Sequence, residues 1–200
     1  MATIAELLAS SLNALKQVQR GEDFTIIKSS DLSRTHIKRL VDNHFLKPII
    51  KGWYVVTDPR ATPGDSTAWY ASFWSFITRY ANERYGNEWC LSAEQSLSIY
   101  TGATIIPNQV LIRAPKGNDY MVPLIPPTSV FNLGAELPSK IDTNNPYNLN
   151  LYTLAEAIIV ATPTMYRNDA LTMRTALAMV HDSSDILKIL VDTGQTVRAG

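Results

Sequence analysis

Six prolines between residues 107 and 138 limit what the middle of this chain can fold into. Proline lacks the backbone N–H that an α-helix uses and clashes with the preceding helical turn, so no long helix can run through this stretch. The short segments between the prolines have a β-like pattern and are separated by turn sequences such as "PKGND" and "PPTS". We expect a small, irregular β region from about residue 105 to 137.

Helical patterns lie on both sides of this β region. Apolar residues recur at steps of three and four over residues 3–19, which predicts an amphipathic helix that Gly21 stops. The aromatic-rich stretch that begins at Ser66 has the same spacing, with Gly86 just past its expected end. Further helical segments follow residue 153. Helices and short strands in one chain of 200 residues predict the α+β class.

Basic residues concentrate in one short segment, although the chain as a whole has a net charge of zero. Residues 28–51 contain six basic and two acidic side chains, a local net charge of +4. Local charge, rather than the overall balance, determines what a surface attracts. This segment is therefore the candidate for a binding surface.

The same segment has the pattern of a helix followed directly by a β-hairpin. Ser33 is a good N-cap for a helix from Arg34 to about residue 44. The runs "LKPII" and "WYVV" predict two strands that turn at Lys51-Gly52, and Pro48 restricts the first of them to a sheet edge. The preceding "FTIIKSS" fits either a short strand or the start of a helix. This order predicts an N-terminal winged helix-turn-helix, followed by a mixed α+β domain with a small irregular sheet.

A helical wheel separates an apolar from a polar face on the helix that starts at Arg34. Ile37, Leu40, Val41 and His44 are expected to face inward, and the opposite face has side chains that suit DNA. Arginine and lysine bind guanine or phosphate, and threonine can contact a thymine methyl group. The predicted DNA-binding residues are Arg34, Thr35, His36, Lys38, Arg39, Lys47 and Lys51.

Two other interpretations of this basic helix remain open. Charged helical faces usually contact only solvent, and many winged helices bind proteins instead of DNA. Asp42 lies on the expected outer face, where it would repel phosphate.

The stretch "DPRATPGDS" has the proline, glycine and aspartate content of a linker. We therefore expect a winged-helix domain at 1–58, a linker at 59–65 and an α+β domain at 66–200. The second domain would supply dimerisation or contact with a partner.

The residues provide no recognisable catalytic set. The three histidines have no metal-binding spacing, no phosphate-binding glycine loop is present, and Cys90 lies in an apolar strand context. We expect no enzymatic activity, metal or cofactor. A single cysteine fits a reducing cytoplasm, and no apolar run is long enough to predict a membrane span.

Two collinear segments resemble the N-terminal region of long bacterial Fic/DOC-family proteins. They are "IKSSDLSRTHIKRLVDNHFLKPIIKGWYVV" with "STAWYASFW", and "NEWCLSAEQSLSIYTGATIIPNQVLIRAPKG" with "TSVFNLGAELP"; "NDALTMRTALAMV" extends the likeness toward the end. The first half also resembles the winged-helix module of AbiEi-type antitoxins. Fic enzymes transfer AMP through an H-x-F-x-x-G-N-G-R loop, which matches none of the three histidine contexts here.

The resemblance implies the non-catalytic front part of a Fic-family protein or a stand-alone relative, and the sequence end at Gly200 favours the former. We expect a DNA-binding regulatory module, an antitoxin-like transcriptional autoregulator. Its partners would be DNA, a toxin or a Fic catalytic domain, and a second copy in a homodimer. The alternative is a protein-interaction or substrate-recruiting domain of a Fic-type AMP transferase. An enzyme in the second domain is a third option, for which no set of titratable residues is evident.

Overall fold

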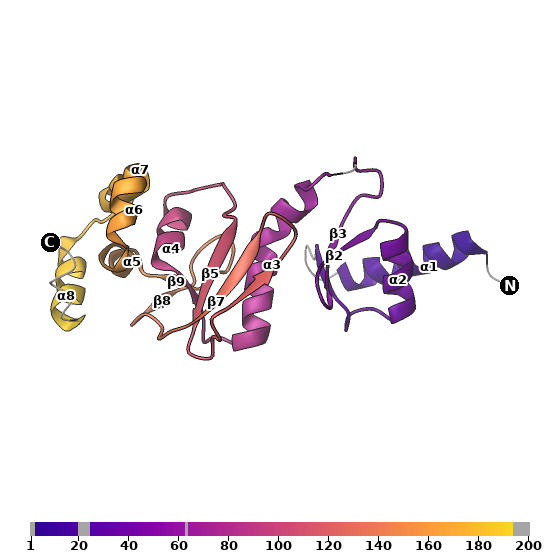
Figure 1. Cartoon of the computed structure of the whole chain (residues 1–200), viewed down its shortest axis with the longest axis horizontal. Coiled ribbons are helices and arrows are strands. Elements are labelled where there is room, and N and C mark those ends of the chain that lie inside the picture. The colour runs from indigo at the N-terminus through magenta and orange to yellow at the C-terminus, as the bar shows by residue number, and fades with distance from the viewer. Residues whose placement is uncertain (1–2, 20–24, 63, 194–200) are drawn as a thin grey trace. The chain divides into compact units, whose positions relative to one another are not determined.

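The computed structural model describes residues 3–19, 25–62 and 64–193, and these form a mixed α+β protein (Figure 1). The expected α+β class is therefore confirmed. The chain divides into two compact units, one with residues 1–77 and 123–127 and the other with 78–122 and 128–200. This division falls inside helix α3 (Thr67–Tyr85), beyond the linker expected at 59–65.

Among its described residues, the first unit combines two whole helices and the first part of α3 with a three-stranded antiparallel sheet. Its elements are α1 (Ile4–Gln19), β1 (Ile26–Lys28), α2 (Arg34–Asp42), β2 (Leu46–Ile50) and β3 (Trp53–Val56), with the strands in the order β1-β3-β2. The predicted hairpin is confirmed, and Gly52 turns it with a φ of +82°. Pro48 lies on an edge strand, as expected. Of the two structures considered for "FTIIKSS", the strand is the one observed, at Ile26–Lys28. The helix end expected at Gly21 lies outside the described residues.

Both faces of this sheet are covered. On one face, Ile27 and Leu46 pack with Leu15 of α1 and with Ile37 and Leu40 of α2. On the other face, Trp53 meets the ring of Phe76 in α3 edge to face, with 5.6 Å between ring centroids. Trp69 and Phe73 extend this aromatic cluster along α3.

The second unit contains the predicted β region. Its four-stranded sheet has the order β4-β5-β7-β6, formed by Cys90–Leu91, Gln109–Ala114, Ser129–Gly134 and Tyr120–Pro123. Strands β5 and β7 run parallel, with Gln109 opposite Ser129 and Ala114 opposite Gly134. A two-stranded sheet of β8 (Ile141–Asp142) and β9 (Leu151–Tyr152) lies further along the chain.

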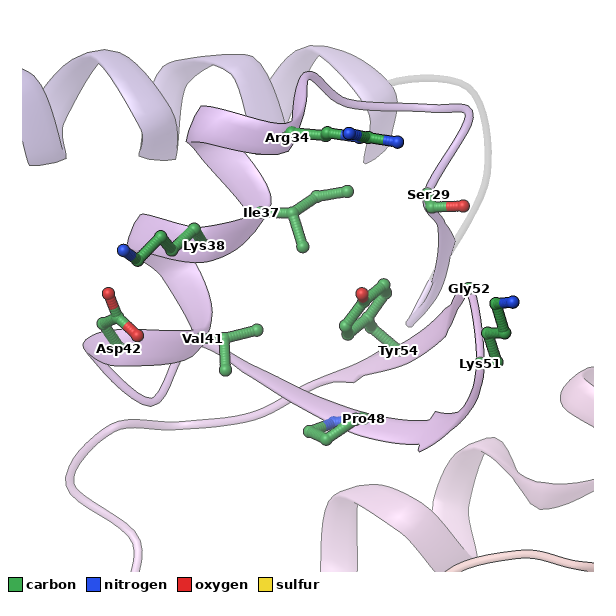
Figure 2. Close-up of a pocket in the computed structure, with 10 residues that line it drawn as sticks. All are labelled: Ser29, Arg34, Ile37, Lys38, Val41, Asp42, Pro48, Lys51, Gly52 and Tyr54. Atoms are coloured by element: carbon green, nitrogen blue, oxygen red, sulfur yellow. The ribbon is translucent and has the colours of Figure 1, made fainter.

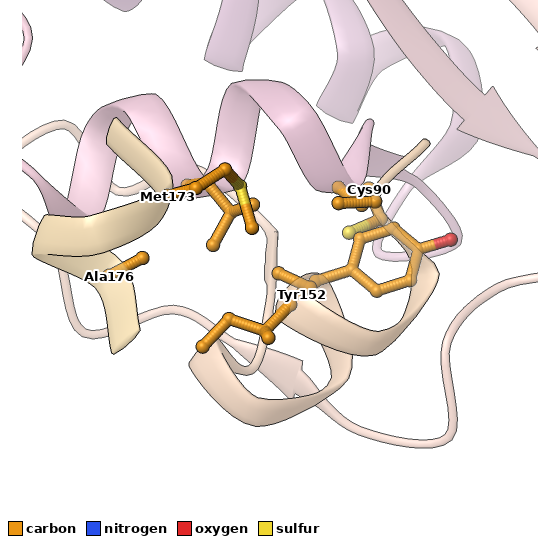
Figure 3. Close-up of a cluster of buried hydrophobic side chains, with 9 residues drawn as sticks. Cys90, Tyr152, Met173 and Ala176 are labelled. Atoms are coloured by element: carbon orange, nitrogen blue, oxygen red, sulfur yellow. The ribbon is translucent and has the colours of Figure 1, made fainter. Parts of the chain in front are cut away.

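Five further helices lie in the described residues of this part of the chain. They are α4 (Ala93–Tyr100), α5 (Leu154–Val160), α6 (Pro163–Asn168), α7 (Ala170–Ala178) and α8 (Ser183–Thr193). Figure 3 shows an apolar core to which α4, α5 and α7 contribute, in which Cys90 and Tyr152 pack with Met173 and Ala176 of α7. Within the described residues, no helix has both the length and the apolar character needed to cross a membrane.

Asn132 is the polar centre of the second unit. It is completely buried on β7, and its amide oxygen accepts hydrogen bonds from the hydroxyl groups of Tyr80 at 3.3 Å and Tyr85 at 2.9 Å. Its amide nitrogen donates to the Tyr120 carbonyl oxygen at 3.3 Å. A buried polar group is costly unless it is hydrogen-bonded, and these bonds satisfy the Asn132 side chain. Because Tyr80 and Tyr85 belong to α3, the same bonds connect α3 to the sheet.

We predict that Asn132→Ala lowers the free energy of unfolding by about 2–3 kcal/mol, because it leaves a small cavity and strips partners from two buried hydroxyl groups. Urea denaturation followed by circular dichroism measures the change. Asn118→Ala, in an exposed turn, is the matched control and should cost less than about 0.5 kcal/mol. Equal losses for the two variants would contradict this role of Asn132.

We also predict that the Cys90 thiol does not react in the folded protein. The residue is fully buried, and burial raises the pKa of its thiol to about 12. The reactive thiolate is therefore scarce near about pH 8, and reagents have no access to it. Iodoacetamide labelling, followed by mass spectrometry with and without urea, should modify Cys90 only after unfolding. Rapid labelling of the native chain would show that the thiol is accessible.

Candidate functional site

Helix α2 is held with one apolar side against the rest of its unit. The Ser33 hydroxyl accepts a hydrogen bond from the His36 backbone N–H at 3.3 Å, which confirms the predicted N-cap. Ile37 and Leu40 are buried, as the wheel predicts. The predicted inward position of His44 is wrong: α2 ends at Asp42, and His44 is exposed with a φ of +62°. The turn back into β2 places this side chain away from the core.

A groove of about 590 Å³ lies between α2 and the β2–β3 hairpin (Figure 2). We call it the α2–hairpin groove. Apolar parts of Ile37, Val41, Pro48 and Tyr54 line its centre. The charged residues around it are Arg34, Lys38, Asp42 and Lys51. It thus combines an apolar floor with a predominantly basic rim.

The cations of this rim are available to a ligand. Arg34, Lys38 and Lys51 are all exposed. In the part of the chain that the structure describes, none of the three has an ion-pair partner. Arg34 and Lys38 are four residues apart and therefore lie on one side of α2. Lys51 comes from the turn of the hairpin, so two separate elements place positive charge around one groove.

The predicted DNA-binding residues fall into two groups. Five are exposed: Arg34, Thr35, Lys38, Lys47 and Lys51. Thr35 lies in a second hollow of about 390 Å³ on α2, which is also lined by Arg34, Lys38, Arg39 and Asp42. Lys47 is on the hairpin and lines neither hollow.

His36 and Arg39 form the second group, because they contact α1. Both are half-buried. The Arg39 Nη1 atom donates to the Ser11 Oγ atom at 2.8 Å and to the Leu7 carbonyl oxygen at 3.0 Å. The His36 Nδ1 atom lies 3.0 Å from the same Ser11 Oγ atom. The wheel assigned Arg39 to the outer face, whereas its guanidinium group reaches back to the first helix.

Ser11 was missed by the sequence reasoning. It is completely buried on α1, four residues after Leu7 and four before Leu15. A serine at this spacing lies on the inward side of an amphipathic helix, where a polar residue needs a hydrogen-bond partner. A serine at an inward position of the expected helix is therefore the sequence signal that could have identified Ser11.

The second unit has polar contacts that serve its packing. The Glu156 carboxylate is buried and accepts hydrogen bonds from the backbone N–H and the hydroxyl group of Ser139, both at 3.1 Å. Burial, with the hydrogen bond to Asp142, raises the pKa of the Tyr100 hydroxyl. Within the described ranges, no three histidine, cysteine or acidic side chains lie together as a metal site would require.

Comparisons with known proteins assign no family to this chain. It matches no protein-family model, and no curated protein matches it. The Fic/DOC and AbiEi resemblances therefore remain predictions from the quoted segments.

Proposed function

We propose that this chain is a DNA-binding regulatory module whose contact surface is the outer side of α2 and the β2–β3 hairpin. The observation that carries the proposal is the arrangement of Arg34, Lys38 and Lys51 around one groove. These three cations are exposed and form no ion pair with any residue that the structure describes. DNA presents a regular row of phosphates, and protein cations that neutralise them release bound counterions. In DNA-binding proteins of this kind, a helix enters the major groove while neighbouring elements such as a hairpin contact the DNA backbone.

The exposed side chains divide this work by their chemistry. Lys38, Lys47 and Lys51 would contact phosphates, because an ammonium group acts as a point charge. Arg34 can bind phosphate or the acceptor atoms of guanine, and Thr35 can meet a base edge or a thymine methyl group. Four exposed cations correspond to a slope of log affinity against log salt of about −3.6 per chain.

A winged helix is the fold that fits this proposal. The order α1-β1-α2-β2-β3 and the hairpin directly after α2 support it. The described residues differ from a simple helix-turn-helix in one respect, since β1 and a turn lie between α1 and α2. If this fold is combined with the resemblance described above, the module would be an antitoxin-like transcriptional autoregulator from the N-terminal part of a Fic-family protein. Residues 78–122 and 128–200 would then contact a second copy, a toxin or a catalytic domain.

The second candidate is protein interaction, for example recruitment of the substrate of a Fic-type AMP transferase. Two features of the α2–hairpin groove favour it. Its floor is apolar at Ile37, Val41, Pro48 and Tyr54, which suits an aliphatic or aromatic side chain. Asp42 in the rim would repel phosphate but could pair with a basic residue of a protein.

We predict that the chain binds duplex DNA from upstream of its own coding sequence and that this binding weakens roughly a hundredfold between about 50 and about 200 mM salt. The double variant Arg34→Ala/Lys38→Ala should bind more weakly, with a slope shallower by about 1.8. Fluorescence anisotropy with a labelled duplex, measured over a series of salt concentrations, gives both quantities.

The matched control is Lys16→Ala/Lys140→Ala, which removes the same charge from exposed positions outside the proposed surface. It should keep the slope of the unchanged chain. If both double variants change the slope equally, the binding reflects overall charge and not this surface. The second candidate would be favoured if the chain binds no DNA but binds a protein partner, and if the Val41→Asp variant no longer binds that protein.

A further inference from the structure

Ser11 is the one fully buried polar side chain of α1 among the described residues, and all its hydrogen-bonding capacity goes to two helices. Its Oγ atom donates to the Leu7 carbonyl oxygen at 3.0 Å within α1. Arg39 and His36 of α2 supply the other two contacts, at 2.8 and 3.0 Å. A hydroxyl group can donate one hydrogen bond and accept two, so three contacts are the most that it can make.

The direction of the His36 contact depends on where the single Ser11 proton lies. Arg39 can only donate to the Ser11 Oγ atom. With the Ser11 proton directed at the Leu7 carbonyl oxygen, the His36 Nδ1 atom donates to Oγ; in the other tautomer, Nδ1 accepts the Ser11 proton. In both cases, two residues of α2 contact the same oxygen atom on α1.

These bonds constrain the rotation of α2 about its own axis. His36 and Arg39 are three residues apart and lie on the side of α2 that contacts α1. The buried contacts of Ile37 and Leu40 are not directional, whereas a hydrogen bond weakens steeply when its geometry changes. The Ser11 contacts therefore define which side chains of α2 face outward, and Arg34 and Lys38 are among them.

We infer that Ser11 is a positioning residue for the proposed DNA surface. By holding His36 and Arg39 against α1, it sets the rotation at which Arg34 and Lys38 share a groove with Lys51. Arg39 then acts through Ser11 and not through a phosphate contact. This inference rests on the proposed function, and it changes the role expected for two of the seven predicted contact residues.

The test compares Ser11→Ala with Ser10→Ala, in the full chain, on the labelled upstream duplex and on a random-sequence duplex of equal length. Ser10 is the exposed neighbour on the same helix, so the chemical change is identical. Circular dichroism identifies a temperature at which all variants are folded. We expect Ser11→Ala to bind the upstream duplex about tenfold more weakly with an unchanged salt slope, because every phosphate-binding cation remains. Ser10→Ala should bind as the unchanged chain does.

Arg39→Met provides the second measurement, and it remains informative if Ser11→Ala does not fold. A positioning role predicts the same loss of affinity as for Ser11→Ala, an unchanged salt slope, and no further loss in the double variant. A slope that is shallower by about 0.9 for Arg39→Met would instead identify a direct phosphate contact and overturn the inference. Unchanged affinity of a folded Ser11→Ala would overturn it as well, while the proposed function would stand. If the unchanged chain shows no salt-dependent binding, the proposed function fails, and the inference fails with it.

Discussion

Strand β3 is the central strand of its sheet, so the hydrogen bonds on both of its edges and the side chains on both of its faces need partners from elsewhere in the chain. Strands β1 and β2 supply the edges. Trp53 and Val55 are buried on the side that meets the aromatic residues of α3, while Tyr54 and Val56 pack toward α1 and α2. A strand can bury side chains on both of its faces only when other elements cover both sides of the sheet, and here helices do so. The position of α2 beside the hairpin, and with it the α2–hairpin groove, depends on this enclosure.

The polar contacts of the first unit determine which of its charged side chains are used inside the unit and which are left exposed. Asp31, one of the two acids of the basic segment, accepts a hydrogen bond from the Lys28 backbone N–H at 2.8 Å in the turn before α2. Lys28 has its ammonium group over the Trp53 ring, 5.3 Å from the centroid. Arg39 donates to α1. Some of the local charge is thus committed to internal contacts, and the remainder is presented by α2 and the hairpin turn.

Local patterns were sufficient to predict the elements that form this surface. The cap at Ser33, the helical spacing after it and the Lys51-Gly52 turn act over a few residues, and the structure contains all three. The parallel pairing of β5 with β7 and the packing of α3 against the first sheet join distant segments, which no local pattern reveals. Gln95 is a comparable case. The Ser92 hydroxyl accepts a hydrogen bond from the Gln95 backbone N–H at the start of α4, and the Gln95 side-chain amide bonds the backbone of β5 at the Gln109 carbonyl oxygen and the Leu111 N–H. The contacts of Ser11 escaped prediction for the same reason, since they require knowledge of which helices meet.

Asp42 gives the α2–hairpin groove a polarity along its length. Arg34 stands in the first turn of α2 and Asp42 at its last residue, with Lys38 between them. A polyanion lying along this helix would meet attraction at one end and repulsion at the other, so its two possible directions would differ in energy. The two ends of the groove therefore differ in charge, and under the proposed function the Asp42 carboxylate would distinguish the two directions of a bound polyanion.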